Sequence, residues 1–317
     1  MKTNHNSRNL LIDFIFVIST FCSSFYQTVF AVNLNISPSP LTISESASPR
    51  VMLTMSRDHQ LYIKAYTDYS DLDGNGILDT SYIDTFDYYG YFDNQKCYIY
   101  TNNRFEPSTA AIGTNSHHCS NQWSGNFLNW ATMTRMDIIR KVLYGGFRYT
   151  DTTETVLERS LIPYDVHSFV KVFTAASTTD MQKYTPYAKT TISLCNLTQA
   201  TGLSKSVNSA SNPPLLRVAE GSYPSWAASE VTQCQWGSDT QPDDEKNLVS
   251  QEHDTGLEVR IKVCVSGLEE TNCKAYGSNN KPTGLLQKYA EASKPVYFGL
   301  MTGSWNKNKS GGCYVAT

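Results

Sequence analysis

The sequence predicts an α/β fold in which helices cover a sheet with parallel strands. Leu257–Val265 alternates apolar and polar residues, which is typical of a half-exposed strand. A short helix is expected over Leu285–Glu291, and Val296–Thr302 is a continuous apolar run of the kind found in a sheet covered on both faces. A strand, a helix and a strand within about 45 residues indicate a βαβ unit with a parallel pair of strands.

Composition limits the function classes. The chain has 317 residues and is 40% hydrophobic, which suits one large domain or two small ones. The net charge is −3 and no block of like charges is present, so no nucleic-acid partner is expected.

The amino-terminal residues 1–31 have the features of a secretory signal peptide. Lys2 and Arg8 give a basic start, and a mostly apolar run covers Leu10–Phe25. Small residues precede a cleavage point after Ala31. The run is too short and too interrupted for a transmembrane helix, so we expect a secreted protein with no stable membrane span after cleavage.

A Ser- and Pro-rich linker is expected over residues 32–49, followed by an α/β domain over residues 50–305. Val51–Met55 is a candidate buried strand of that domain, while Leu61–Tyr66 fits either a strand or a helix. Residues 101–121 and 200–256 are mostly polar and are expected to be irregular.

An acidic segment, Asp71–Asp79, has the spacing of a calcium-binding loop. Calcium binds several hard oxygen ligands at once, and a tightly wound loop points alternate residues inward. Gly76 stands at the sixth position, where such a loop turns sharply. The predicted ligands are the side chains at positions 1, 3, 5 and 9 and the carbonyl at position 7, namely Asp71, Asp73, Asn75, Asp79 and Ile77.

The match to an EF-hand is incomplete. Position 12 is Tyr82, where an EF-hand carries a bidentate Glu, and Asp84 or Asp87 would need a differently shaped exit to replace it. The alternative is a surface turn without an ion, because Asp, Asn and Gly favour turns for local reasons.

The clearest helix is predicted over Asn126–Tyr144. Ser124 is a candidate N-cap, and Gly145 and Gly146 are a strong stop signal. The apolar residues of this stretch recur at helical spacing, which indicates a helix packed on the core. A second helix is predicted to begin at Asp151, with Glu154 completing a capping box, and to end at Pro163.

The sequence contains eight cysteines, of which one, Cys22, lies in the signal. Neighbours along the chain suggest the pairs Cys97–Cys119, Cys195–Cys234 and Cys264–Cys273, although six cysteines allow about 15 pairings. Cys313 is then left over near the end of the chain.

A secreted hydrolase is the alternative function class. No Gly-x-Ser-x-Gly elbow and no His-Glu-x-x-His motif is present in the sequence. His117 and His118 are interpreted as a solvated loop beside a disulfide, and Asp58-His59 near Ser56 is weak as a catalytic set because adjacency does not give triad geometry. We therefore expect no catalytic residues and no organic cofactor.

Several stretches resemble one family in the same order along the chain. The longest is Trp123–Gly146. The others are Asp87–Asp93 followed by Cys97, Thr155–Pro163, Tyr223–Glu230 and Tyr297–Gly303. Over roughly residues 50–311 the chain is similar to the amino-terminal region of the PilC/PilY family of type IV pilus tip-associated adhesins and biogenesis factors.

The resemblance implies a non-enzymatic protein at the pilus tip or cell surface of a bacterium. It implies roles in pilus assembly, adhesion, twitching motility and surface sensing, with minor pilins and host or abiotic surfaces as partners. It also implies a von Willebrand A-like sheet with helices, here carrying long, irregular, disulfide-braced insertions. The regulatory calcium loop of the family lies in a carboxy-terminal propeller, so the loop at Asp71–Asp79 is a separate prediction from the residues themselves.

The sequence departs from the family pattern in three ways, one of which is that the family's carboxy-terminal propeller is not part of it. The first strand is followed by Ser56–Gln60 rather than Asp-x-Ser-x-Ser, so a metal-ion-dependent adhesion site is not expected there. Residues 306–317 form an atypical tail, from which we expect the domain to be incomplete at its carboxyl end. A truncated copy without a function of its own is therefore a third hypothesis, because a sheet cut before its last strands invites aggregation.

Overall fold

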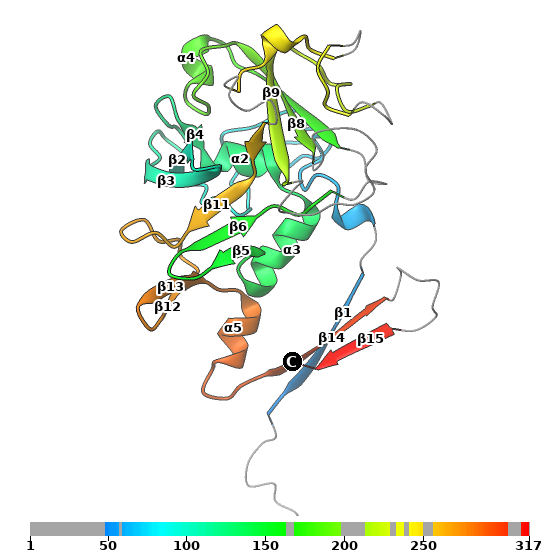
Figure 1. Cartoon of the computed structure of the whole chain (residues 1–317), viewed down its shortest axis with the longest axis vertical. Helices are drawn as coiled ribbons and strands as arrows, with labels where there is room; N and C mark the ends of the chain where they lie inside the picture. Colours follow the sequence, from blue (N-terminus) through cyan, green and yellow to red (C-terminus); the bar gives the residue numbers. More distant parts are fainter. Residues whose placement is uncertain are drawn as a thin grey trace, which may run out of the picture. The chain divides into compact units, whose positions relative to one another are not determined.

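The computed structural model describes residues 48–56, 59–162, 168–197, 213–228, 233–237, 241–249, 256–303 and 312–316. These all lie in one compact unit, Ser48–Thr317, which mixes short helices with four sheets (Figure 1). The predicted signal peptide, most of the linker, Asp58, Pro163 and most of the tail fall outside the described residues.

The largest sheet has six strands in the order β4-β2-β3-β11-β6-β5 (Figure 1). Its strands are β2 (Lys96–Thr101), β3 (Arg104–Ala110), β4 (Trp123–Ser124), β5 (Arg148–Asp151), β6 (Thr155–Glu158) and β11 (Arg260–Val263). A second sheet, in the order β10-β9-β8-β7, contains β7 (Phe169–Thr174), β8 (Thr191–Leu197), β9 (Leu215–Glu220) and β10 (Leu257–Glu258).

Two smaller sheets complete the described strands. One has the order β1-β14-β15 and consists of β1 (Arg50–Met55), β14 (Tyr297–Gly303) and β15 (Gly312–Ala316). The other is a hairpin of β12 (Cys273–Tyr276) and β13 (Asn279–Pro282). The helices are α2 (Gly125–Thr132), α3 (Arg135–Tyr144), α4 (Thr178–Met181) and α5 (Leu285–Ala290), with 3-10 turns at His59–Leu61 and Asp244–Lys246.

The predicted βαβ unit is wrong, although its elements exist. The strand predicted over Leu257–Val265 divides into β10 and β11, and β11 pairs with β3 and β6. β14 instead pairs in parallel with β1, which is the first strand in the sequence. It also pairs antiparallel with β15. The alternation correctly predicted which side chains are buried, because Val259 and Ile261 are fully buried. A period of two fixes the face of a strand but not its partner.

The β1–β14 pair is more exposed than its sequence suggests. Val51 and Met52 of β1 are 41% and 48% exposed, and Tyr297 of β14 is 57% exposed. The prediction of a buried first strand and of a doubly covered β14 is therefore wrong for the described residues. A run of apolar residues does not reveal whether another element covers the faces of the strand.

The long helix predicted over Asn126–Tyr144 is two helices. Ser124 caps α2 by accepting from the Phe127 amide, as predicted, but Met133 is extended (φ −76°, ψ 141°) and ends it. Thr134 and Asp137 then form a capping box that begins α3. Gly145 ends α3 in the left-handed region with φ 85°, which confirms the stop signal.

The helix predicted from Asp151 is wrong, because the segment forms the hairpin β5–β6. Glu154 does not cap a helix but pairs with Arg104 of β3, at 2.7 Å between Nη1 and Oε1. Two segments expected to be irregular also contain strands, since β3 lies within residues 101–121 and β9 lies within residues 200–256. Asn102 and Asn103 connect β2 to β3 with positive φ angles of 51° and 55°, the conformation of a type I′ hairpin turn.

The core is rich in aromatic residues. Tyr82 lies at its centre and contacts five rings, those of Tyr88, Phe127, Trp130, Phe173 and Tyr184, at centroid distances of 5.0–5.8 Å. Most of these contacts are edge-to-face, which the quadrupole of each ring favours. Several of the 20 tyrosines are therefore core residues, among them Tyr82, Tyr88 and Tyr98.

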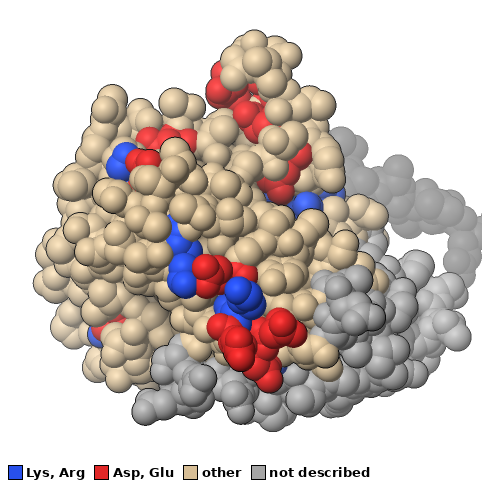
Figure 2. Space-filling view, turned by 90° about the horizontal axis from the view of Figure 1, so that it is seen from above, with Lys and Arg blue, Asp and Glu red and all other residues tan. Residues whose placement is uncertain are grey.

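The three disulfide bonds predicted from sequence neighbours are confirmed. Cys97–Cys119, Cys195–Cys234 and Cys264–Cys273 are all bonded. Cys313 lies on β15, of whose side chains nothing is described. On the face shown in Figure 2, charged residues form small groups, some acidic alone and some mixed, rather than a broad field of one sign.

Candidate metal site

The acidic loop Asp71–Asp79 is wound around the carboxylate of Asp71. This carboxylate accepts hydrogen bonds from the backbone amides of Gly74 (2.8 Å), Asn75 (3.0 Å) and Gly76 (2.8 Å). Gly74 and Gly76 have positive φ angles of 76° and 86°, a conformation that glycine adopts without strain. The sequence therefore forms a tight turn whose backbone amides converge on one carboxylate.

Three of the five predicted ligands come together. One carboxylate oxygen each from Asp71, Asp73 and Asp79 lies within 4.8 Å of the others. Asp79 is 8% exposed, and its Oδ2 also accepts from the amide of Leu72 at 2.7 Å. Three carboxylates at this spacing repel one another in water, and a divalent cation would remove that repulsion.

The other two predicted ligands are arranged differently. The Oδ1 of Asn75 accepts from the amide of Ile77 at 2.8 Å, and its Nδ2 donates to Asp73 at 2.9 Å. The side chain of Ile77 is 70% exposed, as expected where only its carbonyl would bind an ion. The donor set consists of hard oxygens, so it fits calcium. Because Asn75 Oδ1 already accepts from Ile77, the side-chain amide of Asn75 would have to rotate to bind the ion.

The exit of the loop does not supply the missing twelfth ligand. Tyr82 is buried in the aromatic core. The Oδ2 of Asp84 accepts from Asn115 Nδ2 at 2.9 Å, and Asp87 Oδ1 lies 3.0 Å from Nε2 of His117. Both carboxylates that we considered as replacements are therefore occupied by other partners.

A buried ion pair joins the entrance of the loop to the core. Both oxygens of Asp68 lie 2.7 Å from Nζ of Lys171, and Trp130 donates its Nε1 to Oδ1 of Asp68 at 2.8 Å. The Lys171 side chain is fully buried. Burial lowers the pKa of Lys171 to about 8, against the attraction of Asp68. Asp68 itself has a positive φ of 61°, so this pair fixes a strained backbone next to the loop.

The two histidines differ from the solvated loop that we predicted. His117 is 1% exposed, with Nδ1 2.7 Å from the carbonyl of Asp84 and Nε2 3.0 Å from Asp87. His118 Nε2 lies 3.1 Å from Oδ2 of Asp84. The two histidines thus connect their own loop to the segment that contains Asp84 and Asp87. Cys119 is bonded to Cys97 and offers no thiolate for a metal cluster with them.

One other group of described residues has metal-ligand geometry, Cys264, Glu270 and Cys273. Its two cysteines are bonded to each other, which removes the thiolates that a metal would bind. Of the weak catalytic set, Asp58 lies outside the described residues, as does the side chain of His59. The acidic loop is therefore the candidate site that the described residues support best.

Sequence reasoning missed two buried asparagines that hold the aromatic loop following the candidate site. Asn126 Oδ1 accepts from the amide of Tyr88 at 2.7 Å, and its Nδ2 donates to Phe86 O at 2.9 Å. Asn129 bonds the backbone of Tyr88 and Phe92. Both lie within the helix that we predicted to pack on the core. A polar amide side chain in such a helix is the sequence feature that could have indicated a buried hydrogen-bonding role.

Calcium at millimolar concentration is expected to raise the melting temperature of the chain. Extracellular calcium sites bind at about 10⁻⁴–10⁻³ M. Calcium at about 10 mM would then raise the free energy of unfolding by about 1.5–3 kcal/mol and the melting temperature by roughly 3–10 °C. Scanning fluorimetry with and without a chelator measures the shift, and the variant Asp71→Ala/Asp73→Ala should lose it. A shift of equal size in the variant would contradict the site.

Comparison with known proteins gives one family. The model of a domain described as "PilY1 homolog, small alpha/beta domain" matches residues 79–219. Two proteins of Xylella fastidiosa (strain Temecula1 / ATCC 700964), each named type IV pilus biogenesis factor PilY1 homolog, are similar to the chain. One is 39% identical over 274 residues, 82% of this chain and 18% of the relative. The other is 28% identical over 296 residues, 84% of this chain and 22% of the relative. The chain thus spans about a fifth of their length, and no solved structure matches it.

Proposed function

Because the chain belongs to the PilY1-homologue family, we propose that it is a non-catalytic bacterial surface protein that supports type IV pilus biogenesis. The observation that carries the proposal is the similarity, along most of this chain, to a protein named for that role. Adhesion and twitching motility, with minor pilins and host or abiotic surfaces as partners, are the finer part of the same proposal.

Export to the cell surface or pilus tip is supported by the covalent bonds of the fold. Three disulfide bonds close loops in the described residues, and such bonds persist in oxidising compartments. Among the described residues, no helix is long and apolar enough to cross a membrane. The basic, then apolar, amino terminus supports cleavage after Ala31.

We further propose a von Willebrand A-like arrangement for part of the domain. The parallel pairing of β1 with β14 supports it, because an α/β sheet is built from parallel strands that are far apart in the sequence. The calcium ion belongs to the proposal as a structural element. It would neutralise the carboxylates of Asp71, Asp73 and Asp79 and hold the loop, and through Asp68 and Tyr82 the adjoining core, in one conformation.

Deletion of the gene in the bacterium that encodes the chain tests the proposed function. The deletion strain should carry fewer surface pili by electron microscopy and should spread less on agar by twitching. The wild-type gene supplied in trans should restore both. Normal piliation and normal twitching in the deletion strain would refute the proposed function.

A panel of ester, peptide and glycoside substrates tests the non-catalytic part. The purified chain should turn over none of them. Turnover that persists through purification would favour the secreted-hydrolase alternative.

A further inference from the structure

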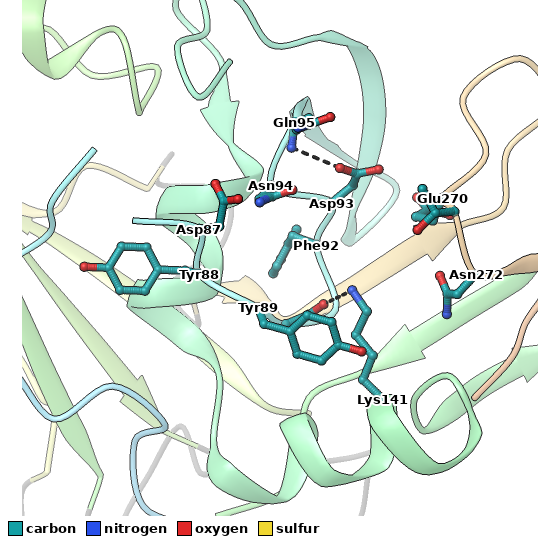
Figure 3. Close-up of a pocket in the computed structure, with 12 residues that line it drawn as sticks. Asp87, Tyr88, Tyr89, Phe92, Asp93, Asn94, Gln95, Lys141, Glu270 and Asn272 are labelled. Carbon is teal, nitrogen blue, oxygen red and sulfur yellow. Dashed lines mark hydrogen bonds between the residues drawn. The ribbon is translucent and has the colours of Figure 1, made fainter. Parts of the chain in front are cut away.

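A cavity of about 410 Å³ lies between the aromatic loop Asp87–Gln95, helix α3 and the segment Glu270–Asn272 (Figure 3). Its volume falls in the range of small-molecule sites, about 300–1,000 Å³. None of its lining residues belongs to the acidic loop Asp71–Asp79. The cavity is therefore a separate feature from the candidate metal site.

Lys141 of α3 points from the helix toward the aromatic loop (Figure 3). Its Nζ donates to the carbonyl of Gly90 and lies 4.6 Å from the ring centroid of Tyr89. Within the described ranges, no carboxylate lies within ion-pair distance of this amine. An ammonium has three donors, and Gly90 O accepts from one of them, so the amine can also donate to a molecule in the cavity. Burial lowers the pKa of Lys141 to about 8, against the attraction of Glu270 and Asp93.

Neutral hydrogen-bonding groups form much of the remaining lining. The side chains of Asn94 and Gln95 have no protein partner in the part of the chain that the structure describes. Asn272 donates its Nδ2 to Thr283 O at 2.9 Å, which leaves its Oδ1 as an acceptor. Tyr89 is 45% exposed and offers both ring surface and a hydroxyl. The cavity therefore presents donors and acceptors beside an aromatic ring.

The acidic groups of the lining are mostly occupied. Asp93 accepts from the amide of Gln95 at 2.9 Å and pairs with Lys96 at 2.9 Å. Glu270 pairs with Lys96 at 3.3 Å and accepts from the amide of Cys264 at 2.6 Å. The third acid, Asp87, lies 3.0 Å from His117. These carboxylates would repel an anion, while the amine of Lys141 would repel a cation.

These groups together select a neutral ligand rich in hydroxyl groups. An apolar ligand would leave the amides and the amine without partners, which is costly when water is displaced. A sugar ring has hydroxyls that both donate and accept, and its C–H faces pack on aromatic rings. We propose that this cavity binds a neutral saccharide of one or two rings, with Lys141 and the amides as hydrogen-bonding partners and Tyr89 as the aromatic surface. The proposal requires neither calcium nor a role in pilus biogenesis.

The test is titration calorimetry of the purified full chain with glucose, galactose, mannose, N-acetylglucosamine, lactose and cellobiose. At least one sugar should bind with Kd on the order of 1 mM or tighter. Lys141→Met should weaken that binding about tenfold or more, as should Tyr89→Leu, because each removes a central contact. Absence of heat with every sugar at about 10 mM would refute the proposal.

The chain offers a matched control for both variants. Lys288 lies 5.7 Å from the ring of Tyr289 on α5, outside the cavity lining. Lys288→Met and Tyr289→Leu should therefore leave the affinity within about twofold. Equal losses in the cavity and control variants would contradict the assignment.

A third variant guards against unfolding of the first two. Asn94→Ala changes a partly exposed side chain with no protein partner among the described residues, so it should weaken sugar binding at an unchanged melting temperature. Acetate and methylammonium test the charge of the ligand. If either displaces the bound sugar at equal concentration, or binds where no sugar does, the cavity is a site for ions and the proposal fails.

Discussion

Asn129→Leu is expected to lower the free energy of unfolding by roughly 3–6 kcal/mol, because three buried backbone groups lose their partner. Asn129 is fully buried on α2. Its Nδ2 donates to the carbonyls of Tyr88 (2.7 Å) and Phe92 (2.9 Å), and its Oδ1 accepts from the amide of Phe92 (3.1 Å). One side chain thus replaces the secondary structure that this part of the loop lacks.

Denaturant unfolding of the variant measures this loss. Asn280→Ala is the matched control, since Asn280 makes one long hydrogen bond to Glu269 at the surface (3.3 Å), and it should cost less than about 1 kcal/mol. Gly90→Ala should act through the same asparagine, because an added Cβ would lie 2.1 Å from Oδ1 of Asn129. A loss of less than about 1 kcal/mol in Asn129→Leu would show that the loop is held by other contacts.

Removal of the Cys195–Cys234 bond is expected to cost about 4 kcal/mol. The bond links residues 39 positions apart, and its loss frees that loop in the unfolded chain. Both cysteines are fully buried in a small core with Trp226, so the variant Cys195→Ala/Cys234→Ala also loses packing. Equilibrium unfolding in guanidinium chloride gives the value.

The shorter bond Cys264–Cys273 is the control for the loop-entropy argument. It links residues 9 positions apart, and its removal should cost about 2.5 kcal/mol from loop entropy alone. The order of the two losses is the informative quantity. If the short-loop variant loses more stability than the long-loop variant, constraint of the unfolded chain does not explain these bonds.

Local signals in the sequence predicted what depends on a few neighbouring residues. The N-cap at Ser124, the stop at Gly145 and the burial pattern around Ile261 are all confirmed. The disulfide pairing by sequence neighbours is also correct, since each bond joins cysteines that are adjacent in cysteine order. These features need no knowledge of which strands meet.

The errors arose where a distant partner decides the outcome. Asp151 and Glu154 have the spacing of a capping box, yet Glu154 binds Arg104, which lies 50 residues earlier. One error is local instead, because Thr134 and Asp137 form a capping box inside a continuous helical pattern and divide one predicted helix into two. The alternation over Leu257–Val265 could not reveal that β11 meets β3 and β6 rather than β14.

The candidate site was predicted in part. Spacing alone placed the carboxylates of Asp71, Asp73 and Asp79 together, and the structure brings them within 4.8 Å. The orientation of Asn75 depends on its hydrogen bonds to Ile77 and Asp73, which spacing does not encode. The ion pair of Asp68 with Lys171 joins residues 103 positions apart, so no local pattern could indicate it.

Titration calorimetry with calcium measures whether the acidic loop binds a divalent ion. The purified chain should bind one calcium ion with Kd of about 10⁻⁴–10⁻³ M. The variant Asp71→Ala/Asp73→Ala should bind none, while Asp243→Ala/Asp244→Ala, which alters an exposed acidic pair elsewhere, should bind as the wild type does. No binding by the wild type in millimolar calcium, or unchanged binding by the loop variant, would contradict the account.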